Sequence, residues 1–182
     1  MSTGMIIIIV VAIVVLAAIA VVGFAMQRRH HLRQRFGDEY DRAVSQHPRR
    51  EAEKELAERE KRHSQLDVRP LSASVRDRYA QRWALVQEQF VDRPGPSVDE
   101  ADRLVTALMA ERGYPTDGYE QQYADLSVEH STTIDHYRAA HEVKTHNERG
   151  QQSTERLRAA MVHYRALFED LLGPAGHRPN AI

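Results

Sequence analysis

Histidine is the residue type in this sequence that is best suited to metal binding or acid–base chemistry. The chain has ten histidines and no cysteine. His136, His141 and His146 recur every five residues within one polar segment. Five residues advance an α-helix by about 500°, so successive rings are rotated by about 140° and do not share a face. The spacing therefore does not predict a common metal site.

The segment HEVKTH at 141–146 resembles the HExxH zinc signature but contains one residue too many. In that signature, two histidines four residues apart meet on one metal. The phosphate-binding motif GxxxxGK[ST], the dinucleotide motif GxGxxG and the nucleophile motif GxSxG do not occur in the sequence. The sequence therefore predicts no enzyme activity, no metal and no cofactor. A helical enzyme that uses His130, His136 or His163 is the alternative with catalytic chemistry.

The tetrapeptide HYRA occurs twice, at 136–139 and at 163–166. One interpretation is a duplicated interaction face, which would consist of His136, Tyr137, Arg138, His163, Tyr164 and Arg165. The other is that two amphipathic helices use the same packing pattern, with tyrosine in the apolar stripe and arginine at its edge. A repeat of four residues arises easily by chance, so the sequence favours the second interpretation.

The elements that must position these residues follow a long apolar stretch. Residues 5–26 read MIIIIVVAIVVLAAIAVVGFAM and contain no charge. As an α-helix this stretch is about 33 Å long, which matches a hydrocarbon core of about 30 Å. A cleaved signal peptide would have a basic start, a shorter apolar core and a small-residue cleavage site. We therefore expect an uncleaved transmembrane helix over 5–26, after a short tail over 1–4.

Four arginines follow the apolar stretch within a basic juxtamembrane segment, residues 27–35. They are Arg28, Arg29, Arg33 and Arg35, whereas the N-terminal tail carries no basic side chain. Because positive charge stays on the cytoplasmic side of a membrane, these arginines determine the topology. The expected location is the cell (inner) membrane, with the N-terminus outside and the C-terminal domain in the cytoplasm.

The rest of the chain has helical periodicity and no long alternation of apolar and polar residues. Apolar side chains recur every three or four residues from Leu71 to Phe90, from Ala101 to Met109 and from Leu157 to Leu171. Residues 49–66 carry a thinner stripe and many charges, which indicates a charged helical arm. We expect an all-α fold, with the transmembrane helix followed by an irregular bundle of five to six helices over 36–172 and a disordered tail over 173–182.

The charge balance argues against one class of partner. The formal net charge is −1, whereas nucleic-acid-binding domains usually carry a strong basic excess. The partners that we expect are the lipid bilayer and an unidentified protein, with a second copy of the chain as a further candidate.

Several segments together resemble an uncharacterised family of bacterial proteins that have one N-terminal span and an α-helical soluble domain. These segments are RFGDEYDRAV, LDVRPLS, RYAQRW with VQEQFVD, ADRLV with MAERGYP, ADLSVEH and AMVHYRALFEDLL. Members of that family are described as hypothetical, membrane or secreted proteins, so the resemblance implies no activity. The function we expect is protein–protein interaction or scaffolding at the inner face of the membrane. An extracytoplasmic envelope adaptor with the same fold is the alternative.

Overall fold

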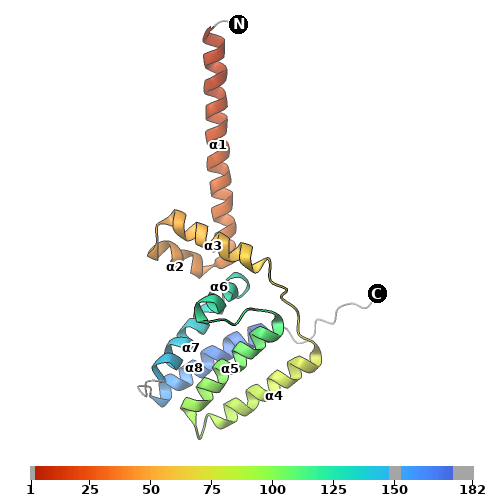
Figure 1. Ribbon diagram of the computed structural model, residues 1–182. Helices are drawn as coiled ribbons and strands as arrows, with labels where there is room; N and C mark the ends of the chain where they lie inside the picture. Colours follow the sequence, from red (N-terminus) through yellow and green to blue (C-terminus); the bar gives the residue numbers. More distant parts are fainter. Residues whose placement is uncertain (1–2, 148–152, 174–182) are drawn as a thin grey trace, which may run out of the picture. The chain divides into compact units, whose positions relative to one another are not determined.

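The computed structural model describes residues 3–147 and 153–173, and the side chains of Thr3 and of residues 5–10 are outside this description. The described residues form eight α-helices and no strands, which confirms the all-α fold (Figure 1). The chain divides into two compact units, residues 1–57 and 58–182. Of the expected tails, Met1, Ser2 and residues 174–182 lie outside the described residues.

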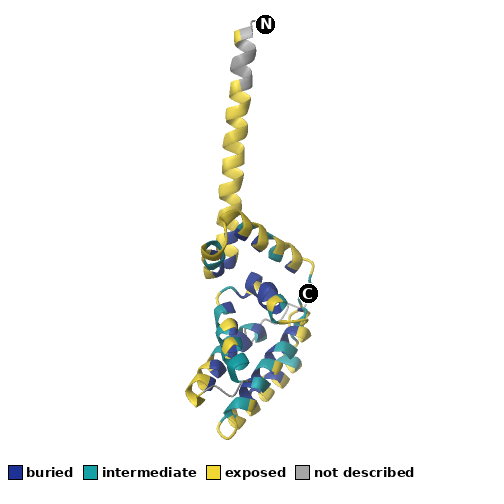
Figure 2. Ribbon diagram, turned by 60° about the vertical axis from the view of Figure 1, so that its left-hand side comes forward, coloured by how far each residue is buried: buried dark blue, intermediate teal, exposed yellow. Residues whose placement is uncertain are grey.

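The N-terminal unit begins with one long helix, α1, over Thr3–Phe36. Its side chains from Val11 to His31 are all exposed, as Figure 2 shows by colour. Within Val11–Phe36, a window of 18 residues has a mean hydropathy of 2.2 and no buried residue, whereas Leu32 and Phe36 near the end of the helix are buried. The helix is therefore long and apolar enough to cross a membrane. The expected juxtamembrane segment, 27–35, is not a separate element, because it continues the same helix.

A glycine ends α1 and allows the chain to turn. Gly37 has a φ of 53°, in a region that side chains with a Cβ rarely adopt. Helix α2 (Asp38–Gln46) follows immediately, and an ion pair of 3.1 Å between Arg33 and Asp41 connects the two helices. In the sequence, Gly37 is a candidate break between the apolar helix and the short helix after it, and the structure confirms this break.

Helix α3 (Arg49–His63) corresponds to the charged arm expected over 49–66. Its thin apolar stripe is buried, since Ala52 and Leu56 are both 0% exposed. In the N-terminal unit, the Tyr40 hydroxyl donates a 2.8 Å hydrogen bond to Glu53 of α3. The apolar stripe of α3 is therefore buried rather than exposed.

The C-terminal unit contains the other five helices. They are α4 (Ala73–Gln89), α5 (Pro94–Arg112), α6 (Tyr119–Glu129), α7 (Ile134–Asn147) and α8 (Thr154–Leu172). Helix α5 contacts α4 on one side and α7 and α8 on the other, while α6 contacts α7 (Figure 1). The bundle is thus organised around α5 and α8.

The core of this unit is formed by the stripes that the sequence predicts. Every predicted inward residue of α5 and α8 is buried, including Leu104, Leu108 and Phe168. Tyr79, Trp83 and Val86 supply the α4 side of the core. Trp83 stacks on Phe168, with ring centroids 4.6 Å apart and planes inclined by 20°. Aromatic stacking thus joins the first and last helices of this unit.

A second glycine is required where α5 ends. Gly113 caps the helix with a φ of 96°, and a Cβ at this position would lie 2.4 Å from the backbone oxygen of Asp67. The backbone amide of Arg69 also donates a hydrogen bond of 2.8 Å to the Arg112 carbonyl oxygen. The connector before α4 therefore lies directly against the end of α5, and this close approach leaves room only for a glycine at position 113.

The helix count and one helix boundary differ from the sequence-based expectation. Seven described helices follow α1, whereas five to six were expected. In the sequence, Ser127 is a candidate N-cap for a helix over about residues 128–148. Ser127 instead lies buried inside α6, and its hydroxyl donates to the Ala124 carbonyl oxygen at 2.7 Å. The break falls instead at His130–Thr133, between α6 and α7. A serine can bond backward within a helix as well as cap one, so its presence alone does not determine the start.

We predict that Phe168→Ala lowers the free energy of unfolding of the C-terminal unit by about 3–5 kcal/mol, because it leaves a cavity against Trp83. Trp83 is the only tryptophan, so its fluorescence during denaturation measures this unit directly. Val162→Ala on the same helix is the control: Val162 is 62% exposed and the loss should stay within about 0.5 kcal/mol. Equal losses for the two variants would contradict the assigned core.

Candidate functional site

The first candidate is a polar cluster at the junction of α6 and α7. His130 is 5% exposed, and its Nδ1 lies 2.8 Å from Oδ2 of Asp170 on α8. The Thr133 hydroxyl donates to the same carboxylate oxygen at 2.5 Å. An ionised carboxylate only accepts hydrogen bonds, so the Nδ1 proton belongs to the histidine. Burial alone would raise the pKa of the Asp170 carboxyl, but the hydrogen bonds from His130 and Thr133 outweigh burial and lower it.

Tyr114 lies on the other side of the His130 ring. Its hydroxyl is 3.3 Å from His130 Nε2 and donates a 3.0 Å hydrogen bond to Glu129. Burial, reinforced by the negative charge of Glu129, raises the pKa of the Tyr114 hydroxyl well above its usual value. The hydroxyl therefore remains protonated at neutral pH. Because it donates its one proton to Glu129, its contact with His130 Nε2 adds no second donated hydrogen bond.

The surroundings of this cluster favour a structural role. None of its side chains lines either of the two surface depressions described below. Instead, the cluster joins the end of α8 to the break between α6 and α7 and to Tyr114 after α5. A partly buried polar network in which each member has a partner stabilises one arrangement of the surrounding helices.

The two HYRA segments lie together where α7 and α8 run side by side. Nδ1 of His136 is 2.8 Å from Nδ1 of His163, and the two rings are inclined by 33°. Burial, and then the neighbouring His136, lower the pKa of the His163 ring. The lowered pKa favours the neutral His163 ring, so one of the two Nδ1 atoms donates and the other accepts.

The tyrosines of the two HYRA segments belong to the core. Tyr137 is 1% exposed and Tyr164 is 0% exposed. The Tyr137 hydroxyl donates to the Gln122 side chain, and the Tyr164 hydroxyl donates to Asp102 at 2.9 Å. The two tyrosines therefore pack in the core, as the amphipathic interpretation of HYRA expects, and a role of the six residues in interaction stays a prediction. Of the six, Arg138 and Arg165 are exposed, and each pairs with a carboxylate on its own helix.

The three histidines at five-residue spacing have separate environments. His136 contacts His163, whereas His141 stacks on Tyr119 with ring centroids 3.7 Å apart. His146 Nδ1 donates to the backbone oxygen of Glu142 at 2.8 Å. Within the described part of the chain, no group of three or more histidine, aspartate or glutamate side chains is arranged to hold a metal ion.

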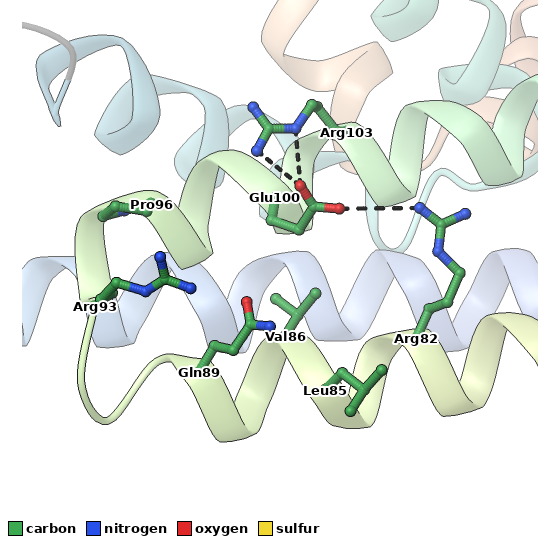
Figure 3. A pocket seen from close by; sticks show the side chains of 8 residues that line it. All are labelled: Arg82, Leu85, Val86, Gln89, Arg93, Pro96, Glu100 and Arg103. Carbon is green, nitrogen blue, oxygen red and sulfur yellow. Dashed lines mark hydrogen bonds and ion pairs between the residues drawn. The ribbon is translucent and has the colours of Figure 1, made fainter.

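The second candidate is a depression of about 390 Å³ between α4 and α5 (Figure 3). Its lining combines three arginines and one glutamate with apolar side chains: Arg82, Leu85, Val86, Gln89, Arg93, Pro96, Glu100 and Arg103. We call this the α4–α5 groove. Glu100 lies between two of the arginines, 2.7 Å from Arg103 Nη2 and 3.9 Å from Arg82 Nη2.

A third surface feature is a depression of about 350 Å³ between α7 and α8. It is lined by His146, Arg156 and His163 together with Glu142, Val143 and two alanines. Its charged side chains are of both signs. The α4–α5 groove has the stronger combination of positive charge and exposed apolar surface, because Leu85 is 55% exposed there.

Comparisons with protein-family models, with curated proteins and with solved structures give no match for this chain.

Sequence reasoning does not find the α4–α5 groove. Arg82 lies four residues before Val86, which belongs to the apolar stripe of α4, and Leu85 lies immediately before it. Both residues therefore lie near the edge of the stripe rather than within it. The signal in the sequence is an exposed leucine beside arginines near the DRPGPS turn. That signal becomes specific only when α5 supplies Glu100 and Arg103 on the opposite side.

We predict that Asp170→Asn lowers the free energy of unfolding at pH 7 by about 1–3 kcal/mol, because charge-assisted hydrogen bonds to His130 and Thr133 are lost. The folded pKa of Asp170 lies below its usual 3.8. Its contribution is therefore complete above the unfolded pKa and is lost as the pH falls through the folded value.

The difference between wild type and Asp170→Asn should accordingly shrink as denaturation curves are measured from pH 7 down to pH 2. Glu169→Gln is the matched control, because Glu169 is exposed and pairs only along its own helix with Arg165. A difference that does not change with pH would show that the Asp170 charge has no role in stability.

Proposed function

We propose that this protein is anchored in the cell membrane by α1 and that its helical domain acts by protein–protein interaction on the cytoplasmic side. The observation that supports the anchor is the exposure of α1. From Val11 to Met26 every side chain of this helix is exposed, and the apolar ones include Leu16, Val21 and Phe24. Water penalises such a surface, whereas a hydrocarbon core accommodates it.

The proposed orientation places the arginines of α1 in the cytoplasm. Arg28, Arg29, Arg33 and Arg35 continue the helix directly after the apolar stretch. Arg33 pairs with Asp41, but acidic residues contribute little to the positive-inside rule. Each arginine near an anionic membrane surface contributes about 1 kcal/mol of attraction. Together they favour an N-terminus outside and the domain inside.

The proposed interaction role is supported by the surface of the C-terminal unit. The α4–α5 groove presents arginines beside an exposed leucine; arginine is enriched at protein interfaces, and the buried centre of an interface is more apolar than the rest of the surface. The polar cluster around His130 has a structural explanation in the helix junction that it joins. Binding is therefore better supported than catalysis.

We predict that the full chain with a C-terminal fluorescent protein fluoresces in cells, and that the same chain with C-terminal alkaline phosphatase is inactive. Fluorescent protein folds in the cytoplasm and the phosphatase requires export, so the pair reports orientation. Replacing Arg28, Arg29, Arg33 and Arg35 by glutamine should reduce fluorescence and raise phosphatase activity, because the charge bias is lost.

The control replaces Arg49 and Arg50 by glutamine. These exposed arginines lie beyond the range of about 15–20 residues over which flanking charge sets topology. They should leave both reporters unchanged. High phosphatase activity from the unaltered chain would reverse the proposed orientation and favour an extracytoplasmic adaptor.

A further inference from the structure

We infer that the α4–α5 groove binds an acidic segment of a partner protein that places an apolar side chain between carboxylates. This inference deepens the proposed function and rests on it, because it assigns a surface and a partner chemistry to the interaction role. The groove is built from two neighbouring helices and presents cationic groups at both of its ends (Figure 3).

The charges of the groove define the sign of its partner. Three arginines and one glutamate line it, which leaves an excess of two positive charges. Across the described residues, the Arg93 guanidinium has no carboxylate partner at the turn between α4 and α5. An anionic ligand would supply the charge that the protein does not place there, and guanidinium binds carboxylate with two parallel hydrogen bonds.

Glu100 fixes the other two arginines without using all their donors. Arg103 directs Nε and Nη2 to the same Glu100 oxygen, at 2.9 and 2.7 Å. Arg82 approaches the other Glu100 oxygen and lies over the Tyr79 ring, 5.8 Å from its centroid. A guanidinium has five N–H donors, so both arginines keep donors for a ligand while their positions are already set.

The apolar part of the groove favours a protein segment over a free anion. Leu85 is 55% exposed, Val86 lies between the Arg82 and Arg93 ends of the groove, and Pro96 lies near Arg93 (Figure 3). A free phosphate would gain nothing from these side chains. A peptide that carries a leucine or similar residue between glutamates or aspartates would satisfy the apolar and the cationic parts together. The positions 82, 85, 86 and 89 share one face of α4, so the surface is elongated along the helix.

The test uses the full chain in nanodiscs of zwitterionic lipid and a panel of fluorescein-labelled 12-residue peptides. Each peptide has leucine at its centre and glutamates three and four residues to either side; a matched set has glutamine in place of glutamate. We expect fluorescence polarisation to detect the glutamate peptides and not the glutamine set. Binding should weaken as NaCl is raised, because salt screens exposed charges.

Two pairs of variants locate the binding. Arg93→Glu should weaken peptide binding by at least about tenfold, because an attraction becomes a repulsion. Its control, Arg158→Glu, makes the same charge change at an exposed position of α8 outside the groove and should leave affinity within about twofold. Leu85→Ala should weaken binding by about three- to tenfold, whereas Val162→Ala, also an exposed apolar site, should not.

Four results would overturn the inference. The first two are equal affinity for the glutamate and glutamine peptides, and equal effects of Arg93→Glu and Arg158→Glu on peptide affinity. The third is that no peptide of the panel binds. The fourth is that Arg93→Glu weakens binding only to added phosphatidylglycerol vesicles and not to the peptides. The last result would assign the arginines to lipid. Failure of the membrane anchor is detected separately, by reporters that do not involve the groove, so the two failures are distinguishable.

Discussion

Helix α1 exposes apolar side chains from Val11 to Met26, and their contact with water has an unfavourable free energy. This constraint determines which environment the helix can occupy. At about 25 cal/mol for each Å² of apolar surface, a helix of this composition needs a non-aqueous environment. In lipid, the backbone of α1 satisfies its own hydrogen bonds along the helix. The break at Gly37 then allows the chain to leave the helix axis and form α2. The membrane proposal therefore follows from one exposed surface.

The C-terminal unit, in contrast, shields its apolar side chains from water, because the apolar stripes of its helices face one another. Helix α5 lies among α4, α7 and α8, and Leu104, Val105 and Leu108 are completely buried. Hydrogen bonds at the edge of this core hold the helices in register. Tyr164 is hydrogen-bonded to Asp102, and His130 is hydrogen-bonded to Asp170. A rigid bundle of this kind can present a surface such as the α4–α5 groove without any chemistry of its own.

Helical periodicity predicts the core because burial follows one face of each helix. The stripes from Tyr79 to Val86 and from Leu157 to Leu171 are buried as expected, and the glycine at 113 ends α5. Periodicity does not show which helices meet. Two contacts depend on residues that are far apart in the sequence. One joins His136 to His163, and the other joins Arg82 to Arg103 through Glu100. The buried state of Tyr137 and Tyr164 agrees with their places in the apolar stripes.

The central claim, that α1 crosses the membrane with the domain inside, can be measured directly because the chain has no cysteine. Single cysteines would be introduced as Gly4→Cys near the start of α1 and as Ala84→Cys on the exposed face of α4. Intact spheroplasts would then be treated with a membrane-impermeant maleimide. We predict labelling of the cysteine at 4 at once, and labelling of the cysteine at 84 only after the membrane is permeabilised. Labelling at 84 in intact spheroplasts would contradict the account.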